Sequence, residues 1–181
     1  MKILFLNPPD LNKVNEYVLE EHSKDYIGSE DFGAFPPLGL LYVMAYLEKN
    51  APHHKLYFKD CVAERVGHKK LNDYVAEIKP DIVAVTSFTV SMVDVVIAAR
   101  SIRKILPNAH LCLGGHHPIA FPFEAASLSE FNSVVVGEGE IVFTELVKAI
   151  EDKRSFTDIT GVYTKESIQK YRNTTLKDRR F

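Results

Sequence analysis

The segment Asp81–Thr86 (DIVAVT), with a continuous apolar centre at Ile82–Val85, lies between Pro80 and Ser87. Its apolar residues do not alternate with polar ones, which is typical of a strand whose two faces are both covered. A helical pattern follows up to about Leu106, and a second apolar run, His110–Leu113, comes next. A strand, a helix and another strand in this order predict a parallel sheet with helices on both faces.

The same order extends outward in both directions along the chain. Further strand patterns lie at 2–6, 55–60 and 133–136, and helical patterns lie at 36–49, 69–79, 123–128 and 140–151. We therefore predict an α/β fold with a doubly wound, flavodoxin-like, parallel five-stranded sheet of strand order 2-1-3-4-5. We also expect a small C-terminal hairpin between Gly161–Tyr163 and Ser167–Tyr171, and a short helix at Asn15–Glu21 inside the long 10–35 segment.

The composition is that of a globular domain. The 181 residues are 46% hydrophobic and 25% charged, with a net charge of −2, so no basic excess predicts a nucleic-acid partner. No apolar run approaches the roughly 20 residues that a membrane span needs. Cys61 and Cys112 lie far apart within or beside apolar strand patterns, so we expect buried, reduced thiols in a cytoplasmic protein.

Four loops follow the predicted strands, at the sheet edge where ligands of this fold class bind. Each loop also has an interpretation that needs no ligand. A glycine pair at Gly114–Gly115 suits a tight turn as well as a closely approaching ligand. Hydroxyls in Thr86–Thr89 can cap the next helix or donate to a ligand. His116 and His117 are adjacent, so in extended backbone they would point to opposite sides and make a poor chelating pair.

The fourth loop, Gly137–Glu140, follows a strand and begins a helix, where free N–H groups favour a polar ligand. Its two glutamates argue against a bare phosphate and also suit the first turn of a helix without any ligand. A ribose or an amide-bearing ligand fits this loop better than a phosphate.

Several familiar kinds of binding site are excluded because the chain lacks their sequence motifs. The first loop, Asn7–Asp10, carries no G-x-G-x-x-G fingerprint, and the chain has no P-loop. A phospho-receiver domain needs acidic residues after the first and third strands and a lysine after the fifth, whereas Asn7, Thr86 and Gly137 stand there. No zinc-ligand spacing and no pairing of a nucleophile with a base is evident.

The run Phe35–Glu48 (FPPLGLLYVMAYLE) resembles the segment that begins the first helix of the cobalamin-binding domain of radical S-adenosylmethionine enzymes. The four loops are similar to the same family in order and spacing, and the resemblance covers residues 1 to about 150. Its nearest relatives in style are magnesium-protoporphyrin monomethyl ester cyclases and cobalamin-dependent methylases.

The resemblance implies that residues 1–152 bind cobalamin over the carboxyl ends of the strands. It implies that Ser87 and Thr89 line a groove for the nucleotide tail and that Gly114 and Gly115 let the tail pass. Residues 8–35 would lie near the corrin. The implied cofactor-binding residues are Asn7, Pro8, Pro9, Thr86, Ser87, Phe88, Thr89, Gly114, Gly115, His116, Val136, Gly137, Glu138 and Gly139.

Two departures from the family qualify this expectation. Histidine-ligating cobalamin domains carry D-x-H-x-x-G, but Asp60–Arg65 after the second strand has Val62 in place of the histidine, so we expect no metal ligand there. The cluster motif C-x-x-x-C-x-x-C is also absent. We therefore expect S-adenosylmethionine and an iron–sulfur cluster only in a missing catalytic domain, toward which residues 153–181 would lead as a hairpin and linker.

The expected function is thus a cobalamin-binding module without a complete active site of its own. Two alternatives remain at this point. One is a flavin-binding flavodoxin-like module, although Asn7–Asp10 lacks the hydroxyls of a flavin phosphate loop. The other is a degenerate domain that binds no cofactor and serves as an interaction surface.

Overall fold

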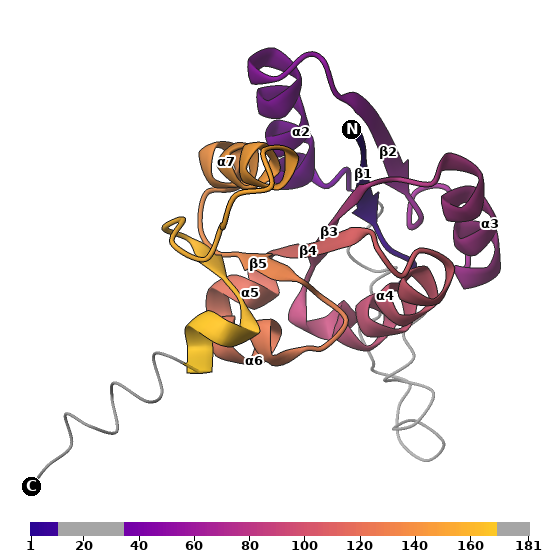
Figure 1. The fold of residues 1–181 in the computed structure, drawn as a ribbon. Coiled ribbons are helices and arrows are strands. Elements are labelled where there is room, and N and C mark those ends of the chain that lie inside the picture. The colour runs from indigo at the N-terminus through magenta and orange to yellow at the C-terminus, as the bar shows by residue number, and fades with distance from the viewer. Residues whose placement is uncertain (11–34, 170–181) are drawn as a thin grey trace, which may run out of the picture.

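A computed structural model describes residues 1–10 and 35–169 (Figure 1). The expected helix at 15–21 and the terminal segment 170–181 lie outside the described residues.

Five parallel strands form the centre of the molecule, as predicted. They are β1 (Lys2–Asn7), β2 (Lys55–Asp60), β3 (Ile82–Ser87), β4 (His110–Gly115) and β5 (Ser133–Val135). Their order in the sheet is β2-β1-β3-β4-β5, followed by a sixth strand, β6 (Val162–Tyr163). The flavodoxin-like order inferred from the strand and helix pattern is therefore confirmed.

A C-terminal antiparallel pair is present, but its two strands are not the two segments that we expected to pair. β6 pairs antiparallel with β5, with Tyr163 opposite Val134, and residues 165–169 are helical. The reason lies in two side chains that exchange hydrogen bonds with the backbone. Thr164 N–H donates to Ser167 Oγ at 2.8 Å, and Ser167 N–H donates to Thr164 Oγ1 at 3.2 Å. This reciprocal arrangement starts a helix, so the second arm of the hairpin does not form.

Helices cover both faces of the sheet. The long ones are α2 (Leu38–Asn50), α3 (His68–Ile78), α4 (Met92–Ile105) and α7 (Gly139–Glu151), and the short ones are η2 (Thr89–Ser91), α5 (His116–Ala120) and α6 (Pro122–Ser127). α2 and α7 lie side by side over one face (Figure 1). Side chains of α3, α4 and α6 pack on the other.

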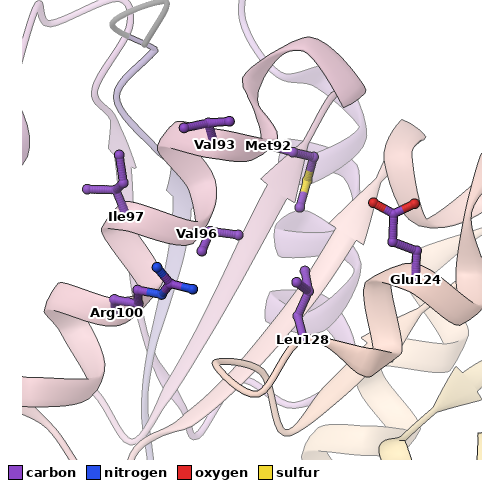
Figure 2. Close-up of a pocket in the computed structure, with 7 residues that line it drawn as sticks. All are labelled: Met92, Val93, Val96, Ile97, Arg100, Glu124 and Leu128. Carbon is purple, nitrogen blue, oxygen red and sulfur yellow. The ribbon is translucent and has the colours of Figure 1, made fainter. Parts of the chain in front are cut away.

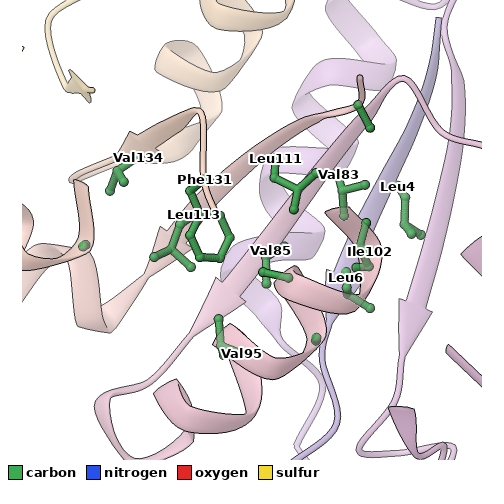
Figure 3. Packing of buried hydrophobic residues seen from close by; sticks show 14 of the residues in the cluster. Leu4, Leu6, Val83, Val85, Val95, Ile102, Leu111, Leu113, Phe131 and Val134 are labelled. Carbon is green, nitrogen blue, oxygen red and sulfur yellow. The ribbon is translucent and has the colours of Figure 1, made fainter. Parts of the chain in front are cut away.

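Alternate residues of each central strand supply two separate cores. Leu4 and Val83 belong to the core beneath α3 and α4, which Figure 3 shows. Ile3 and Phe5 belong to the core beneath α2 and α7, where Phe5 makes an edge-to-face contact with Phe143 at 5.6 Å between ring centroids. A strand whose residues are buried on both faces reads as a continuous apolar run, which is why β3 was recognisable from its sequence.

The face of α4 that packs against the sheet does not carry all of the bulky side chains of the helix. Val95, Ala98 and Ile102 are buried against the sheet, whereas Val93 is exposed. The buried face combines the small side chains of Ala98 and Ala99 with the larger ones of Val95 and Ile102, and Val93 lies on the outer side of the helix.

Candidate functional site

The register of the parallel strands brings all four loops to one edge. β3 and β4 end together, with Thr86 opposite Gly114 and Ser87 opposite Gly115. The hydroxyl of Ser87, which is 1% exposed, donates to the carbonyl of Gly114 at 2.9 Å. Ser87 therefore holds the ends of the two strands together, an internal role that sequence reasoning did not assign to it.

The reversal of strand order lies between β1 and β3. The chain leaves β1 toward α2 on one face and leaves β3 toward α4 on the other, so their loops diverge at this point. Pro8 and Pro9 after β1 are buried, and the side chain of Asn7 donates to Asp60 Oδ1 at 2.9 Å. These residues form the floor of the divergence.

The adjacent residues Gly114 and Gly115 are glycines for different structural reasons. Gly115 has a φ of +98°, and a Cβ there would lie 2.6 Å from the backbone oxygen of Ser87, so the protein itself requires glycine. Gly114 has no such conformation, and a Cβ there would meet no atom within 4 Å. Gly114 consequently faces open space at the end of the central strands, where a ligand has room to approach the backbone.

The loops after β3 and β4 contact each other through their rings. Phe88 stacks on His116 with 4.7 Å between centroids and 12° between planes. Thr89 Oγ1 lies 3.2 Å from Nδ1 of His117, whose ring is 3% exposed. The opposite ring nitrogen of His117 is buried with no hydrogen-bond partner. Such an atom is costly to leave unsatisfied, so it is a candidate for a contact with a bound group.

The expectation of extended backbone at His116 and His117 is wrong. The turn at Gly115 leads directly into α5, so the two histidines occupy the first turn of a helix. Successive helical residues still point to different sides, and His116 is exposed while His117 is buried. The two rings therefore point to different sides, as expected, although the backbone there is helical and not extended.

Exposed apolar side chains gather on the same loops. Phe88 is 51% exposed, Ile119 is 56% exposed and Phe121 is 47% exposed. Val90 and Leu38, which also follow the carboxyl ends of strands, are exposed as well. Patches of this kind mark ligand or partner sites. Sequence reasoning missed Ile119 and Phe121, although apolar residues directly after a glycine-terminated strand were the available signal.

The loop after β5 lies at the same edge and has its own internal constraints. Gly137 has a φ of +93°, which glycine adopts without strain. A Cβ on Gly139 would lie 2.8 Å from Val43 Cγ2, so this glycine allows α7 to approach α2. Val136 is half-buried and its N–H donates to Gly161, whereas Glu138 is exposed. Among the predicted site residues of this loop, Glu138 has an exposed side chain, Val136 is half-buried, and the other two are glycines.

Val62 lies outside the divergence of β1 and β3. It follows β2, the strand at the outer edge, and its N–H donates to Asp60 Oδ1 at 3.1 Å in a tight turn. A ligand at the switch point would contact the loop after β1, whose described residues Asn7–Asp10 contain no histidine. The expectation that Val62 leaves a bound cobalt without a ligand from this loop stays a prediction.

The described residues also enclose a groove of about 270 Å³ between α4 and α6 (Figure 2). Its lining is mainly aliphatic and consists of Met92, Val93, Val96, Ile97, Arg100, Glu124 and Leu128. This volume is below the roughly 300–1,000 Å³ typical of small-molecule sites. The groove lies on the α4 face of the sheet and does not include any of the predicted site residues.

Both cysteines are buried and unpaired, as expected. Burial raises the pKa of Cys61 and of Cys112 to about 12. A thiol with so high a pKa stays protonated at neutral pH and is a poor nucleophile.

Comparison with known proteins decides the family. Residues 27–147 match the B12 binding domain family. The chain belongs to that family. This membership, with the open glycine and apolar loops at the switch point, does not favour the flavin alternative, and the family resemblance inferred from the sequence motifs is confirmed.

The curated relatives of this B12-binding domain include larger enzymes. It is 34% identical over 125 residues to an anaerobic magnesium-protoporphyrin IX monomethyl ester cyclase of Cereibacter sphaeroides, covering 68% of this chain and 20% of that protein. It is 30% identical over 168 residues to an uncharacterized methyltransferase of Pyrococcus horikoshii, covering 92% of this chain and 33% of that protein. The chain thus spans about a fifth to a third of these relatives.

A solved structure shares the fold. The radical S-adenosylmethionine methyltransferase TsrM of Kitasatospora setae, solved with cobalamin and a 4Fe-4S cluster bound, superposes with a TM-score of 0.69 at 22% identity. The match covers 89% of this chain and 28% of that chain. In this B12-binding domain, no helix within residues 1–10 and 35–169 is long and apolar enough to cross a membrane.

Proposed function

We propose that this B12-binding domain holds cobalamin at the carboxyl edge of its sheet and presents it to a radical S-adenosylmethionine domain. The observation that carries the proposal is the open, apolar edge itself. Gly114 faces empty space, and exposed rings and aliphatic side chains stand on the loops beside it. A large macrocycle with a flexible tail covers such a surface, whereas a phosphate needs a compact ring of donors.

The residues divide by what they offer to the cofactor. Gly114 leaves room for the tail at the end of β4, and the free ring nitrogen of His117 offers it a hydrogen bond. Phe88 and His116, already stacked, offer a flat apolar face. When bound, cobalamin supplies a cobalt centre for methyl transfer or electron transfer. We propose no cobalt ligand among the described loop residues.

The catalytic half belongs to a further domain in this proposal. The chain has two cysteines, both buried, and therefore cannot hold a three-cysteine cluster by itself. S-adenosylmethionine and the cluster would come from the radical domain, as the printed names of the relatives suggest for those proteins. Unpaired thiols fit the cytoplasmic location that we propose for the whole enzyme.

Cofactor retention tests the proposal. The purified chain is incubated with hydroxocobalamin or with flavin mononucleotide, desalted, and examined by visible spectroscopy. We expect corrin bands to be retained and flavin to be lost. Retention of flavin alone would support the flavodoxin-like alternative, and retention of neither would support a degenerate interaction domain, so either result contradicts the proposal.

A pair of matched variants locates the cofactor. Gly114→Leu fills the open space at the end of β4, and Gly67→Leu adds the same side chain at the N-cap of α3, at a glycine that also has no atom near its missing Cβ. We expect Gly114→Leu to weaken cobalamin binding about tenfold or more, since it occupies volume that the tail needs. Gly67→Leu should bind as the wild type does, and equal binding by both variants would place the cofactor elsewhere.

A further inference from the structure

A second cluster of ligand-type side chains lies at the opposite edge of the sheet. His53 and His54 immediately precede β2, and Glu151 is the last residue of α7. Parallel strands begin at this edge, so the cluster is separated from the carboxyl-edge loops by the length of the sheet. Neither the family nor the proposed cobalamin site accounts for these three residues.

The three side chains converge on one point. His53 Nε2 lies 3.1 Å from both carboxylate oxygens of Glu151, and His54 Nε2 lies 3.7 Å from Oε2 of the same carboxylate. One ligand atom from each residue falls within 4.8 Å of the others. Ligand atoms around a tetrahedral zinc ion are roughly 3.3 Å apart, given bonds of about 2.0–2.1 Å. The measured separations lie on both sides of that value.

An ordinary ion pair between His53 and Glu151 explains only part of this arrangement. The side chain of His54 is fully buried, with 0% exposure, yet its Nε2 has no hydrogen-bond partner and is directed toward the carboxylate. A buried imidazole nitrogen without a partner is unfavourable unless something binds it. Its Nδ1 is within 3.3 Å of the Met1 amino group, which orients the ring from behind.

We propose that His53, His54 and Glu151 form a binding site for a divalent transition-metal ion of the Zn²⁺ class. Two imidazoles and one carboxylate are a ligand set that zinc uses in proteins, with a fourth position left to water. His53 and Glu151 are partly exposed, with side-chain exposures of 59% and 35%, so an ion can enter from solvent.

The bound ion would connect two segments far apart in the sequence. His53 and His54 lie in the turn between α2 and β2, and Glu151 ends α7, the helix that packs beside α2. The ion would thus join the ends of the two helices that cover the same face, at a position that cobalamin does not reach. Its expected effect is therefore on stability and not on cofactor retention.

Direct metal binding tests this proposal. The chain, prepared without a polyhistidine tag and treated with a chelator, is titrated with Zn²⁺ by calorimetry and with Co²⁺ by visible spectroscopy. We expect one ion per chain, intense d–d bands of four-coordinate Co²⁺, and a higher melting temperature with Zn²⁺. Binding of no ion, or weak binding with the spectrum of hydrated Co²⁺, would overturn the site.

Two conservative variants separate the site from general effects. Glu151→Gln and His53→Ala change partly exposed side chains, so both proteins should fold, and each should bind Zn²⁺ about tenfold or more weakly because a ligand is lost. Glu145→Gln, an exposed position on the same helix, should bind as the wild type does. Equal affinity in all four proteins would contradict the assignment, whatever the outcome of the cobalamin experiments.

Discussion

The two edges of the sheet differ in how far their side chains are covered by the rest of the protein. At the carboxyl edge, Phe88 and Phe121 are half-exposed and Gly114 faces open space. At the amino edge, His54 is enclosed and His110 is held by a neighbouring strand. A parallel sheet with reversed strand order separates its loops at one edge only, so ligand-sized openings arise there, while the other edge is filled by side chains.

β4 connects the two edges, because it begins at the amino edge with His110 and ends at the carboxyl edge with Gly115. The two ends are stabilised by different means. His110 depends on burial of a neutral ring, and Gly115 depends on a backbone conformation that side chains do not adopt without strain. Substitutions at these ends test the comparison directly.

The largest expected effect is that of Gly115→Ala. The new methyl group would lie 2.6 Å from Ser87 O and 2.7 Å from Ser87 N, at a φ of +98°. Both terms oppose folding, and we expect a loss of about 4 kcal/mol in the free energy of unfolding. Urea denaturation followed by circular dichroism measures it. Gly114→Ala is the matched control and should change this free energy by less than about 0.5 kcal/mol; comparable losses in both variants would show that the two glycines do not differ.

The next effect concerns acid. Burial lowers the pKa of His110 to about 4, and the charge of Arg103 acts in the same direction. The unfolded chain therefore binds a proton at His110 between about pH 6.5 and pH 4 that the folded chain does not bind. Stability present above this window falls as the pH falls through it, by about 3 kcal/mol at its lower end.

His110→Gln should remove that part of the pH dependence, and denaturant unfolding at several pH values between 4 and 7 measures it. His116→Gln, which changes an exposed ring just past the other end of β4, should leave the slope as in the wild type. If His110→Gln retains the wild-type slope, the amino end of β4 is not the acid-sensitive end of the strand.

The smallest expected effect is at His116. Its ring is stacked on Phe88, and we propose that it does not ligate cobalt. Electron paramagnetic resonance of the chain with reduced, cob(II)alamin should show no splitting by an imidazole nitrogen, and His116→Ala should leave the spectrum unchanged. Nitrogen splitting that disappears in His116→Ala would contradict this proposal and would make the carboxyl edge a metal-ligating edge as well.

The central part of the fold was predictable because its signals are local. Ile82–Val85 is apolar throughout since both faces of the strand are covered, and the proline and glycine residues after the strands mark where the strands end. The partner of the C-terminal strand was predicted wrongly, because Thr164 and Ser167 bond to each other's backbone and begin a helix where the second arm was expected. Short exchanges of this kind compete with strand pairing, and composition does not reveal which prevails.

The candidate site was predictable as a set of loops but not as a set of roles. Gly114 and Gly115 look alike in sequence, and only their surroundings show that one serves the turn and the other leaves space. Ser87 was expected to meet a ligand, yet its hydroxyl is directed to Gly114. The His53, His54 and Glu151 cluster joins positions almost 100 residues apart, and no motif spacing in the sequence indicated it.

The antiparallel strand β6 has a consequence for association between molecules. A parallel sheet exposes unpaired backbone groups at both outer strands, and these can pair with another chain. In the part of the chain that the structure describes, β6 covers the outer side of β5 with only two residues, which is too short a template for extension. The other outer strand, β2, begins with the exposed Lys55, which lies beside the ring of Tyr57 and whose charge disfavours a neighbouring strand there. The shortness of β6 and the charge on β2 therefore both disfavour pairing with a strand of another molecule, which restricts growth of the sheet into larger assemblies.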